Sequence, residues 1–191
     1  MSVSANELGV ITLQDLHELS PDEVKKVASL HSTVMRVLLT DLGARAVMAY
    51  YQLARGEPEV VGCAALDLRG QVMGLVVGSQ NPRELTNKVR VSIPGFTWRL
   101  VARMCVSPTL AWRIACLFLC SPKGVELARD EIELTYIGVS PLARGAGVGN
   151  ALLKAFVQNS ASRGYRRVSL SVETDNLAAI ALYKRHNFRI T

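Results

Sequence analysis

The stretch from Ile132 to Phe156 constrains the fold of this chain more than any other part of the sequence. It opens with an extended apolar run, Ile132 to Val139, and then passes through a short glycine-rich loop. Apolar residues recur at helical spacing directly after that loop, at Val148, Ala151, Leu152, Ala155 and Phe156. The sequence therefore predicts a strand, a tight turn and a helix in immediate succession.

A turn of this kind is suited to binding a phosphate or pyrophosphate. Glycines let backbone N–H groups turn inward and let a ligand approach closely, and the helix start adds unpaired N–H groups and the positive end of the helix dipole. The loop does not follow the G-x-x-x-x-G-K-S/T pattern of nucleoside triphosphate loops or the G-x-G-x-x-G order of dinucleotide folds. A tight turn that binds no ligand is the alternative at this point.

The loop reads Arg144-x-x-Gly147-x-Gly149 and follows a strand that ends in Ile137-Gly138-Val139. It resembles the acetyl-coenzyme A loop of the GNAT superfamily of N-acetyltransferases. That loop has glutamine or arginine, then glycine, then glycine or alanine at the same spacing, after a strand ending in an apolar residue, any residue and valine.

A second block, from Leu170 to Phe188, reads LSVETDNLAAIALYKRHNF. It is similar to the last motif of the same family, L-x-V-x-x-x-N-x-x-A-x-x-L-Y-x-x-x-G-F, with Asn176, Ala179, Leu182, Tyr183 and Phe188 in register. Asn187 stands where the family usually has glycine, at a helix end that needs a left-handed residue. Asparagine is the next-best residue there. The resemblance is strong over the last third of the chain and weaker before it.

The resemblance implies an α/β (α+β) fold with a mixed, mostly antiparallel central sheet flanked by helices. We expect one acetyltransferase domain over residues 1–191, with a variable apolar helical insert at about 81–129. Family members normally continue past the Phe188 position with two further strands, and the last of these inserts beside the strand built here by Val168 to Val172. Because the sequence ends at Thr191, we expect one edge of that strand to lack a neighbour. A truncated piece, a partner subunit or the chain's own N-terminal residues would each account for that edge.

The family's co-substrate is acetyl-CoA, and the resemblance assigns its site by position. Backbone N–H groups from Arg144 to Gly149 are expected to bind the pyrophosphate, and main-chain groups of Ile137 and Val139 to line the pantetheine arm. The full set of expected coenzyme-binding residues is Ile137, Val139, Arg144, Gly145, Ala146, Gly147, Val148, Gly149 and Asn176.

Two proton transfers accompany acetyl transfer to an amine, because the ammonium loses a proton and the departing thiolate gains one. Tyr183 matches the family's common general acid by position, and a core tyrosine on an amphipathic helix is the alternative. Glu133 lies on the strand where some relatives carry a base, and partial desolvation of its carboxylate suits that role. Glu173 is a second candidate base, and an exposed glutamate without chemistry is the alternative for Glu133.

Charge and cysteine content narrow the remaining possibilities. Lys and Arg number 22 against 16 for Asp and Glu, giving a net charge of +6 that favours attraction of anions such as a phosphorylated cofactor. The sequence contains no nucleic-acid-binding motif, so we expect no nucleic-acid partner. Four cysteines lie in apolar surroundings without ligand spacing, which predicts reduced thiols, no metal and a cytoplasmic protein. The N-terminal residues MSVSANELG have neither a basic start nor a long apolar run, so we expect no signal peptide.

The middle segment, residues 81–129, carries two apolar runs, Phe96 to Val106 and Leu110 to Cys120, separated by Ser107-Pro108-Thr109. This break and the arginines within the runs argue against a membrane span. Two core or interface helices are one interpretation, and an acceptor pocket or a peripheral membrane contact is the other. Trp98 and Arg99 are the expected acceptor contacts here.

The N-terminal half reads as a first strand, Leu8 to Leu13, two helices and a hairpin. Ser20 to Glu23 form a capping box, and one helix face carries Val24, Val27, Ala28 and His31. Thr40 and Asp41 are expected to open the second helix, before hairpin strands Val60 to Leu66 and Gln71 to Val77.

These observations together predict transfer of an acetyl group from acetyl-CoA to an amine, on a small molecule or a protein, by direct attack. A non-catalytic acyl-CoA-binding sensor and a transferase of longer acyl chains are the alternatives. The sequence leaves open whether the protein forms a homodimer.

Overall fold

The computed structural model describes residues 2–5, 9–35, 37–94, 98, 105 and 127–189. Its helices and strands, in chain order, are β1 (Ser2–Ala5), β2 (Gly9–Asp15), η1 (Leu16–Glu18), α1 (Pro21–Val34), α2 (Leu38–Asp41), α3 (Ala44–Gly56), β3 (Val60–Leu66), β4 (Val72–Ser79), α4 (Pro82–Ser92), β5 (Glu131–Val139), η2 (Pro141–Ala143), α7 (Val148–Ser162), β6 (Arg167–Leu170) and α8 (Leu177–Arg185).

The described strands form a six-stranded sheet in the order β1-β2-β3-β4-β5-β6. All neighbouring pairs are antiparallel except β5 and β6, which are parallel and are joined through α7. Antiparallel neighbours require only short turns, whereas a parallel pair requires a crossover such as this helix. The predicted mixed, mostly antiparallel sheet is confirmed.

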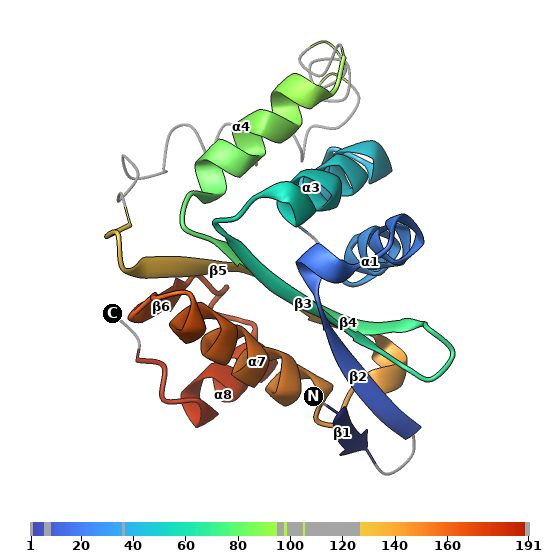
Figure 1. Cartoon of the computed structure of the whole chain (residues 1–191), viewed down its shortest axis with the longest axis vertical. Helices are drawn as coiled ribbons and strands as arrows, with labels where there is room; N and C mark the ends of the chain where they lie inside the picture. Colours follow the sequence, from blue (N-terminus) through green and yellow to red (C-terminus); the bar gives the residue numbers. More distant parts are fainter. Residues whose placement is uncertain are drawn as a thin grey trace.

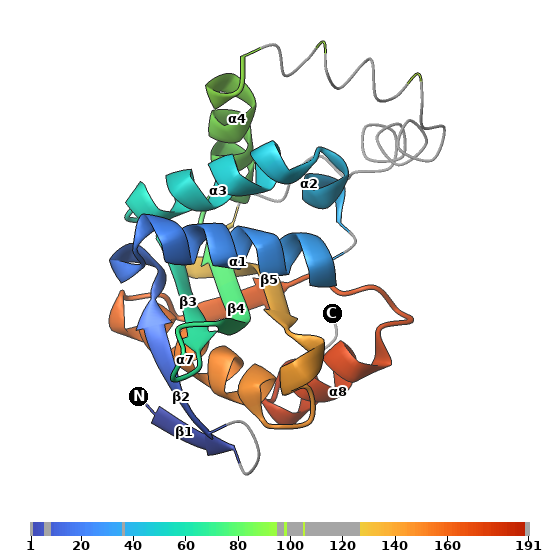
Figure 2. The same cartoon turned by 90° about the vertical axis from the view of Figure 1, so that its right-hand side faces the viewer.

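Helices cover both faces of the sheet. Figure 2 shows α1 and α3 on one side and α7 and α8 on the other, and Figure 1 shows α4 beyond α3. Strand β3 illustrates the alternation: Val60, Ala64 and Leu66 pack with α1 and α3, while Val61 and Cys63 pack with α7. Both faces of β3 and β4 are buried, as expected for the central strands of a layered fold.

Local sequence signals set several of the boundaries. Helix α1 starts with the predicted capping box, in which Ser20 and Glu23 bond reciprocally to each other's backbone N–H. The predicted start of the second helix is wrong. Thr40 and Asp41 belong to the short helix α2, and α3 begins after Gly43, whose φ of 96° breaks the helical path.

The two edges of the sheet differ. Strand β1, which the sequence patterns did not indicate, pairs with β2 at one edge. Strand β6 lies at the other edge and, within the described ranges, pairs with β5 alone. The N-terminal residues therefore do not cover the edge of β6, which removes one of the three explanations for that edge.

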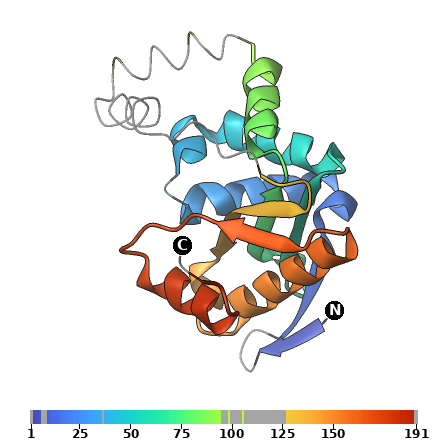
Figure 3. The same cartoon turned by 90° about the vertical axis from the view of Figure 1, so that its left-hand side faces the viewer.

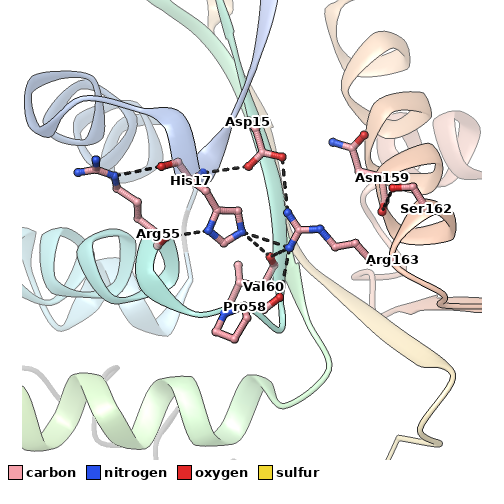
Figure 4. A network of polar contacts seen from close by, with 8 residues as sticks. All are labelled: Asp15, His17, Arg55, Pro58, Val60, Asn159, Ser162 and Arg163. Carbon is pink, nitrogen blue, oxygen red and sulfur yellow. Dashed lines mark hydrogen bonds and ion pairs between the residues drawn. The ribbon is translucent and has the colours of Figure 1, made fainter.

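A polar network joins the C-terminal end of α7 to the opposite side of the sheet (Figure 4). The Arg163 guanidinium donates to the carbonyl oxygens of Val60, at 2.7 Å, and Pro58, at 3.2 Å. It also lies 3.6 Å from the Asp15 carboxylate and 3.2 Å from Nε2 of His17. This network holds the C-terminal end of α7 against the sheet. The glycine-rich loop lies at the opposite, N-terminal end of the same helix.

The predicted middle segment is described only in part. Helix α4 has Asn81 as its N-cap and Pro82 as its first residue, and it is followed by an exposed Trp98. Arg99 and the two apolar runs lie outside the described residues, apart from the single positions 98 and 105. In the part of the chain that is described, no helix combines the length and apolar character needed to cross a bilayer.

Candidate active site

The glycine-rich loop sits where β5 meets α7. After Val139, the N–H of Ser140 donates to Met73 O of β4 at 2.8 Å, and the buried Ser140 Oγ accepts from Leu142 N at 3.4 Å. The chain then passes through η2 and reaches Arg144, whose side chain is exposed. The end of β5 is thus fixed to the sheet before the loop begins.

Two glycines of the loop have left-handed backbones, with φ of 80° at Gly145 and 79° at Gly147. A Cβ placed at either position would meet no atom within 4 Å. The need for glycine therefore comes from the backbone conformation, and the side on which a Cβ would point is open. Gly149 has an ordinary backbone, and a Cβ there would make van der Waals contacts of 3.5 Å with Val139 and 3.7 Å with Leu182.

The start of α7 is an anion-binding arrangement. Gly147 is its N-cap and caps the helix with no side-chain hydrogen bond. The first bond within the helix runs from Ala151 N–H to Gly147 O at 3.0 Å, so the N–H groups of Val148, Gly149 and Asn150 precede the helical ladder. Those groups, the dipole of this 15-residue helix and the exposed Arg144 all favour a bound phosphate. Ala146 is half-buried against the apolar core on the α7 side.

The pairing of β5 with β6 ends before this loop, which leaves an opening in the ladder of main-chain hydrogen bonds. The two strands pair from Glu131 opposite Arg167 as far as Leu134 opposite Leu170, and β5 then continues alone on that side to Val139. Because Ser140 bonds to β4 and main-chain groups alternate along a strand, those of Val139 and Ile137 point toward the opening. These unpaired groups suit an extended ligand that carries amides.

Tyr183 lies on α8, on the same side of the sheet as α7 (Figures 2 and 3). It is 7% exposed, belongs to the apolar core that includes Val148 and Leu152, and its ring lies 5.7 Å from that of Phe188. Burial raises the pKa of its hydroxyl above the ordinary value of 10.0. The phenol therefore remains protonated at neutral pH, which is the state required of a proton donor.

Glu133 lies on the opposite face of β5. Its neighbours Ile132 and Leu134 pack with the α7-side core, so the alternation of the strand directs Glu133 toward α1 and α3. Its side chain is half-buried, and burial raises the pKa of the carboxyl above 4.5, with Arg83 acting against this rise and Glu131 adding to it. A carboxylate with a raised pKa is a better proton acceptor near neutral pH.

A β-bulge brings a tyrosine to the same face as Glu133. The register with β4 shifts between Val77, which faces Tyr136, and Gly78, which faces Leu134, so Thr135 is the extra residue. In a regular strand Glu133 and Tyr136 would point to opposite faces, but Tyr136 packs with the α1 and α3 core. Burial raises the pKa of Tyr136 to about 12, and the Glu133 carboxylate adds to the rise.

Tyr136 belongs to a four-ring cluster with His31, Tyr50 and Tyr51. Its ring centroid lies 4.8 Å from His31 and 5.5 Å from Tyr50, in edge-to-face arrangements. His31 Nδ1 is hydrogen-bonded to the Tyr51 hydroxyl at 2.8 Å. Burial lowers the pKa of His31 to about 4, so this ring is neutral at pH 7 and adds no positive charge near Glu133. Sequence patterns placed His31 on a helix face and did not indicate the cluster.

Two buried polar atoms of this cluster, His31 Nε2 and the Tyr50 hydroxyl oxygen, have no hydrogen-bond partner among the described residues. Burial raises the pKa of Tyr50 and the nearby Thr135 side chain acts against this rise, but the pair is outside hydrogen-bond geometry. Polar atoms left in this state are uncommon in folded proteins.

The two remaining candidates lie on the segment between β6 and α8. Asn176 caps α8, because its side-chain oxygen accepts from Ala179 N at 3.2 Å. Glu173 is exposed, and its carbonyl accepts from Asn176 N. Glu173 lacks the burial that distinguishes Glu133. Asn187 has the expected left-handed backbone, with φ of 63°.

The structure therefore divides the predicted site residues into two groups. The loop from Arg144 to Gly149, the end of β5 and Tyr183 adjoin one another on the α7 side. Glu133 lies on the other face of β5, with Tyr136. Within the described ranges, no three side chains of His, Cys, Asp or Glu are arranged as a metal-binding group.

Residues 27–188 match the acetyltransferase (GNAT) family. The chain belongs to this family. Mycothiol acetyltransferase of Amycolatopsis mediterranei is 46% identical over 56 residues, which are 29% of this chain and 19% of that protein. The same-named protein of Jonesia denitrificans is 44% identical over 57 residues, which are 30% of this chain and 18% of that protein. The aligned segments thus span less than a fifth of these relatives.

Solved structures confirm the fold over nearly the whole chain. An aminoglycoside N-acetyltransferase in complex with CoA superposes with a TM-score of 0.61 at 13% identity, covering 95% of this chain and 89% of that one. The ribosomal-protein-S18-alanine N-acetyltransferase from Escherichia coli gives a TM-score of 0.58 at 14% identity, covering 95% and 79%. The GNAT fold predicted from the sequence motifs is confirmed.

Proposed function

We propose that this protein transfers an acetyl group from acetyl-CoA to an amine in a direct reaction. The observation that carries the proposal is the position of the left-handed glycine loop and the α7 N-terminus beside an opening in the sheet, with a buried, protonated tyrosine adjoining. The family match and the similarity to an N-acetyltransferase that binds CoA support this assignment.

The residues fit an extended, phosphorylated thioester. The open side of Gly145 and Gly147 leaves room for a pyrophosphate at the first turn of α7. Main-chain groups of Ile137 and Val139 would bond the amides of the pantetheine arm along the free side of β5. Asn176, at the start of α8, is proposed to contact the same arm.

Side chains on the two sides of the sheet would then carry out the two proton transfers. Glu133 accepts the proton of the acceptor ammonium, directly or through water, on the α1 and α3 side. The amine nitrogen forms a bond to the acetyl carbon as the carbon–sulfur bond breaks, and Tyr183 donates its proton to the departing sulfur. The acceptor is an amine of a small molecule or a protein, as in the aminoglycoside and ribosomal-protein enzymes that share the fold.

A screen of amines with acetyl-CoA, detecting released thiol, tests this function. We expect at least one amine class to release thiol in proportion to enzyme concentration. If acetyl-CoA binds but no amine releases thiol, the protein is a non-catalytic acyl-CoA-binding domain. Faster turnover with long-chain acyl-CoA than with acetyl-CoA would indicate the transferase of longer acyl chains.

We also propose that the described residues form one acetyltransferase domain in a reducing, cytoplasmic setting. The family match over residues 27–188 and the unpaired, buried Cys63 thiol support this.

A further inference from the structure

Helix α8 carries Tyr183, and its other residues are exposed or only partly buried. Tyr183 is its one buried residue, and Leu177 at its start is 73% exposed. Two of its side-chain hydrogen bonds are local. Arg185 Nε donates to Ala181 O at 3.3 Å, and Ala179 N donates to the side chain of Asn176. The position of the proposed general acid therefore depends on a small number of longer-range contacts.

One side-chain hydrogen bond connects the end of α8 to another described element. His186, the C-cap of α8, lies with its Nε2 2.6 Å from Oδ1 of Asn150 in the first turn of α7. A carbonyl oxygen can only accept, so His186 Nε2 donates.

The same junction also brings apolar groups together. Gly149, which directly precedes Asn150, has Leu182 of α8 and Val139 of β5 at van der Waals distance from its Cβ position. The end of β5, the first turn of α7 and α8 therefore meet at one point. That point is where we place the pyrophosphate.

The link from His186 to Tyr183 is short and stiff. The Tyr183 carbonyl accepts from His186 N at 3.0 Å and from Phe188 N at 3.1 Å, and the Tyr183 ring packs on Phe188. A displacement of His186 is thus transmitted to the ring that carries the reacting hydroxyl.

We propose that the Asn150–His186 hydrogen bond is a positioning contact, through which occupancy of the α7 N-terminus orders α8 and places Tyr183 for proton donation. Both residues act through Tyr183 and neither donates the reacting proton. The inference rests on the proposed acetyl transfer, and it adds that coenzyme binding and placement of the acid are coupled.

The test uses pairs of substitutions in the full chain. His186→Leu removes the donor, while His186→Gln keeps an N–H at similar reach. Asn150→Ala removes the acceptor, while Asn150→Asp keeps an oxygen. Lys184→Leu changes an exposed residue of the same helix and is the matched control.

Steady-state kinetics use acetyl-CoA and the best amine of the thiol-release screen. We expect His186→Leu and Asn150→Ala each to lower kcat roughly 10-fold, because misplacing a catalytic group by less than 1 Å is costly, with little change in KM for acetyl-CoA. The double variant should lose no more than either single variant, and His186→Gln should recover most of the rate. Wild-type kcat in His186→Leu, or multiplied losses in the double variant, would overturn the proposal.

Hydrogen exchange of the peptide spanning residues 177–185 gives a readout that needs no acceptor. Acetyl-CoA should slow exchange there in the wild type and in Lys184→Leu, but not in His186→Leu. Equal slowing in His186→Leu would overturn the coupling even if turnover is normal. If the wild type binds acetyl-CoA but acetylates no amine, the proposed function is wrong, and the exchange result still decides whether coenzyme binding is coupled to the order of α8. If the wild type does not bind acetyl-CoA, both the proposed function and this coupling are wrong.

Discussion

The two faces of β5 are built differently. On the α7 side, the glycine loop, the helix start and α8 come from one continuous part of the chain, residues 137–188. On the α1 and α3 side, Glu133 lies next to a cluster assembled from α1, α3 and β5. The proposed coenzyme side is therefore a local structure, whereas the proposed acceptor side depends on tertiary packing. Changes to the first should affect coenzyme binding and acid catalysis, and changes to the second should affect the acceptor amine and stability.

The largest expected effect is the loss of acetyl-CoA binding in Gly147→Val. A branched residue at φ of 79° is strained by about 1–3 kcal/mol, and its side chain would occupy the open side of the loop. Calorimetric titration should detect no binding. Gly164→Val is the matched control, because Gly164 has φ of 90° and an equally open Cβ position at the far end of α7. Equal coenzyme affinity in a folded Gly147→Val protein would contradict the loop assignment.

Tyr183→Phe should lower kcat roughly 10²-fold, the usual scale for a positioned acid. The ring and its contact with Phe188 remain, so acetyl-CoA affinity and the melting temperature should change little. Tyr165→Phe, at a partly buried tyrosine of the same core, is the control. Unchanged turnover in Tyr183→Phe would show that Tyr183 is a core tyrosine and not the general acid.

Glu133→Gln should remove the acidic limb of the pH profile of kcat/KM for the amine. Since burial raises the pKa of Glu133, that limb should lie above 4.5 in the wild type, and activity should fall as the pH decreases through it. The raised pKa also means that folding favours the protonated form, so ionised Glu133 destabilises the protein above its folded pKa. Glu133→Gln should therefore raise the melting temperature at pH 7 and not at pH 4. If the pH profile of Glu133→Gln is identical to that of the wild type, another group acts as the base.

The smallest expected effect on turnover belongs to His31, which touches no proposed substrate. Its pKa is lowered from 6.5 to about 4, so the unfolded chain binds a proton more readily than the folded one between these values. Stability should fall as the pH decreases from 6.5 to 4, by at most about 3 kcal/mol. His31→Phe should flatten that part of the stability curve, measured by denaturant unfolding. Retention of the full slope in His31→Phe would show that other groups cause it.

The difference between the two faces of β5 also explains which features could be predicted from the sequence. The capping box at Ser20 and the left-handed Asn187 depend on residues a few positions apart, and both are confirmed. The loop at Gly147 is local for the same reason. The true start of α3 was missed because Gly43 ends one helical path and begins another within a continuous apolar pattern.

The proposed acceptor side was not predictable in the same way. The bulge at Thr135 adds one residue to a strand without any sequence signal, and it reverses the face on which Tyr136 lies. His31 and Tyr51 are far apart in sequence and meet only when α1 packs on α3. The family resemblance identified Glu133 but not the rings beside it. The hydrogen bond between Asn150 and His186 is likewise formed by residues that no local pattern connects.

The most direct test of acetyl transfer is a stoichiometric one. The protein is incubated with acetyl-CoA labelled in the acetyl group and with an active amine, and both released thiol and labelled amide are quantified by mass spectrometry. The account predicts one labelled amide for each thiol released, with both products strongly reduced in Tyr183→Phe and absent without the amine. Thiol release without labelled amide, or binding of acetyl-CoA with neither product for any amine, would contradict it.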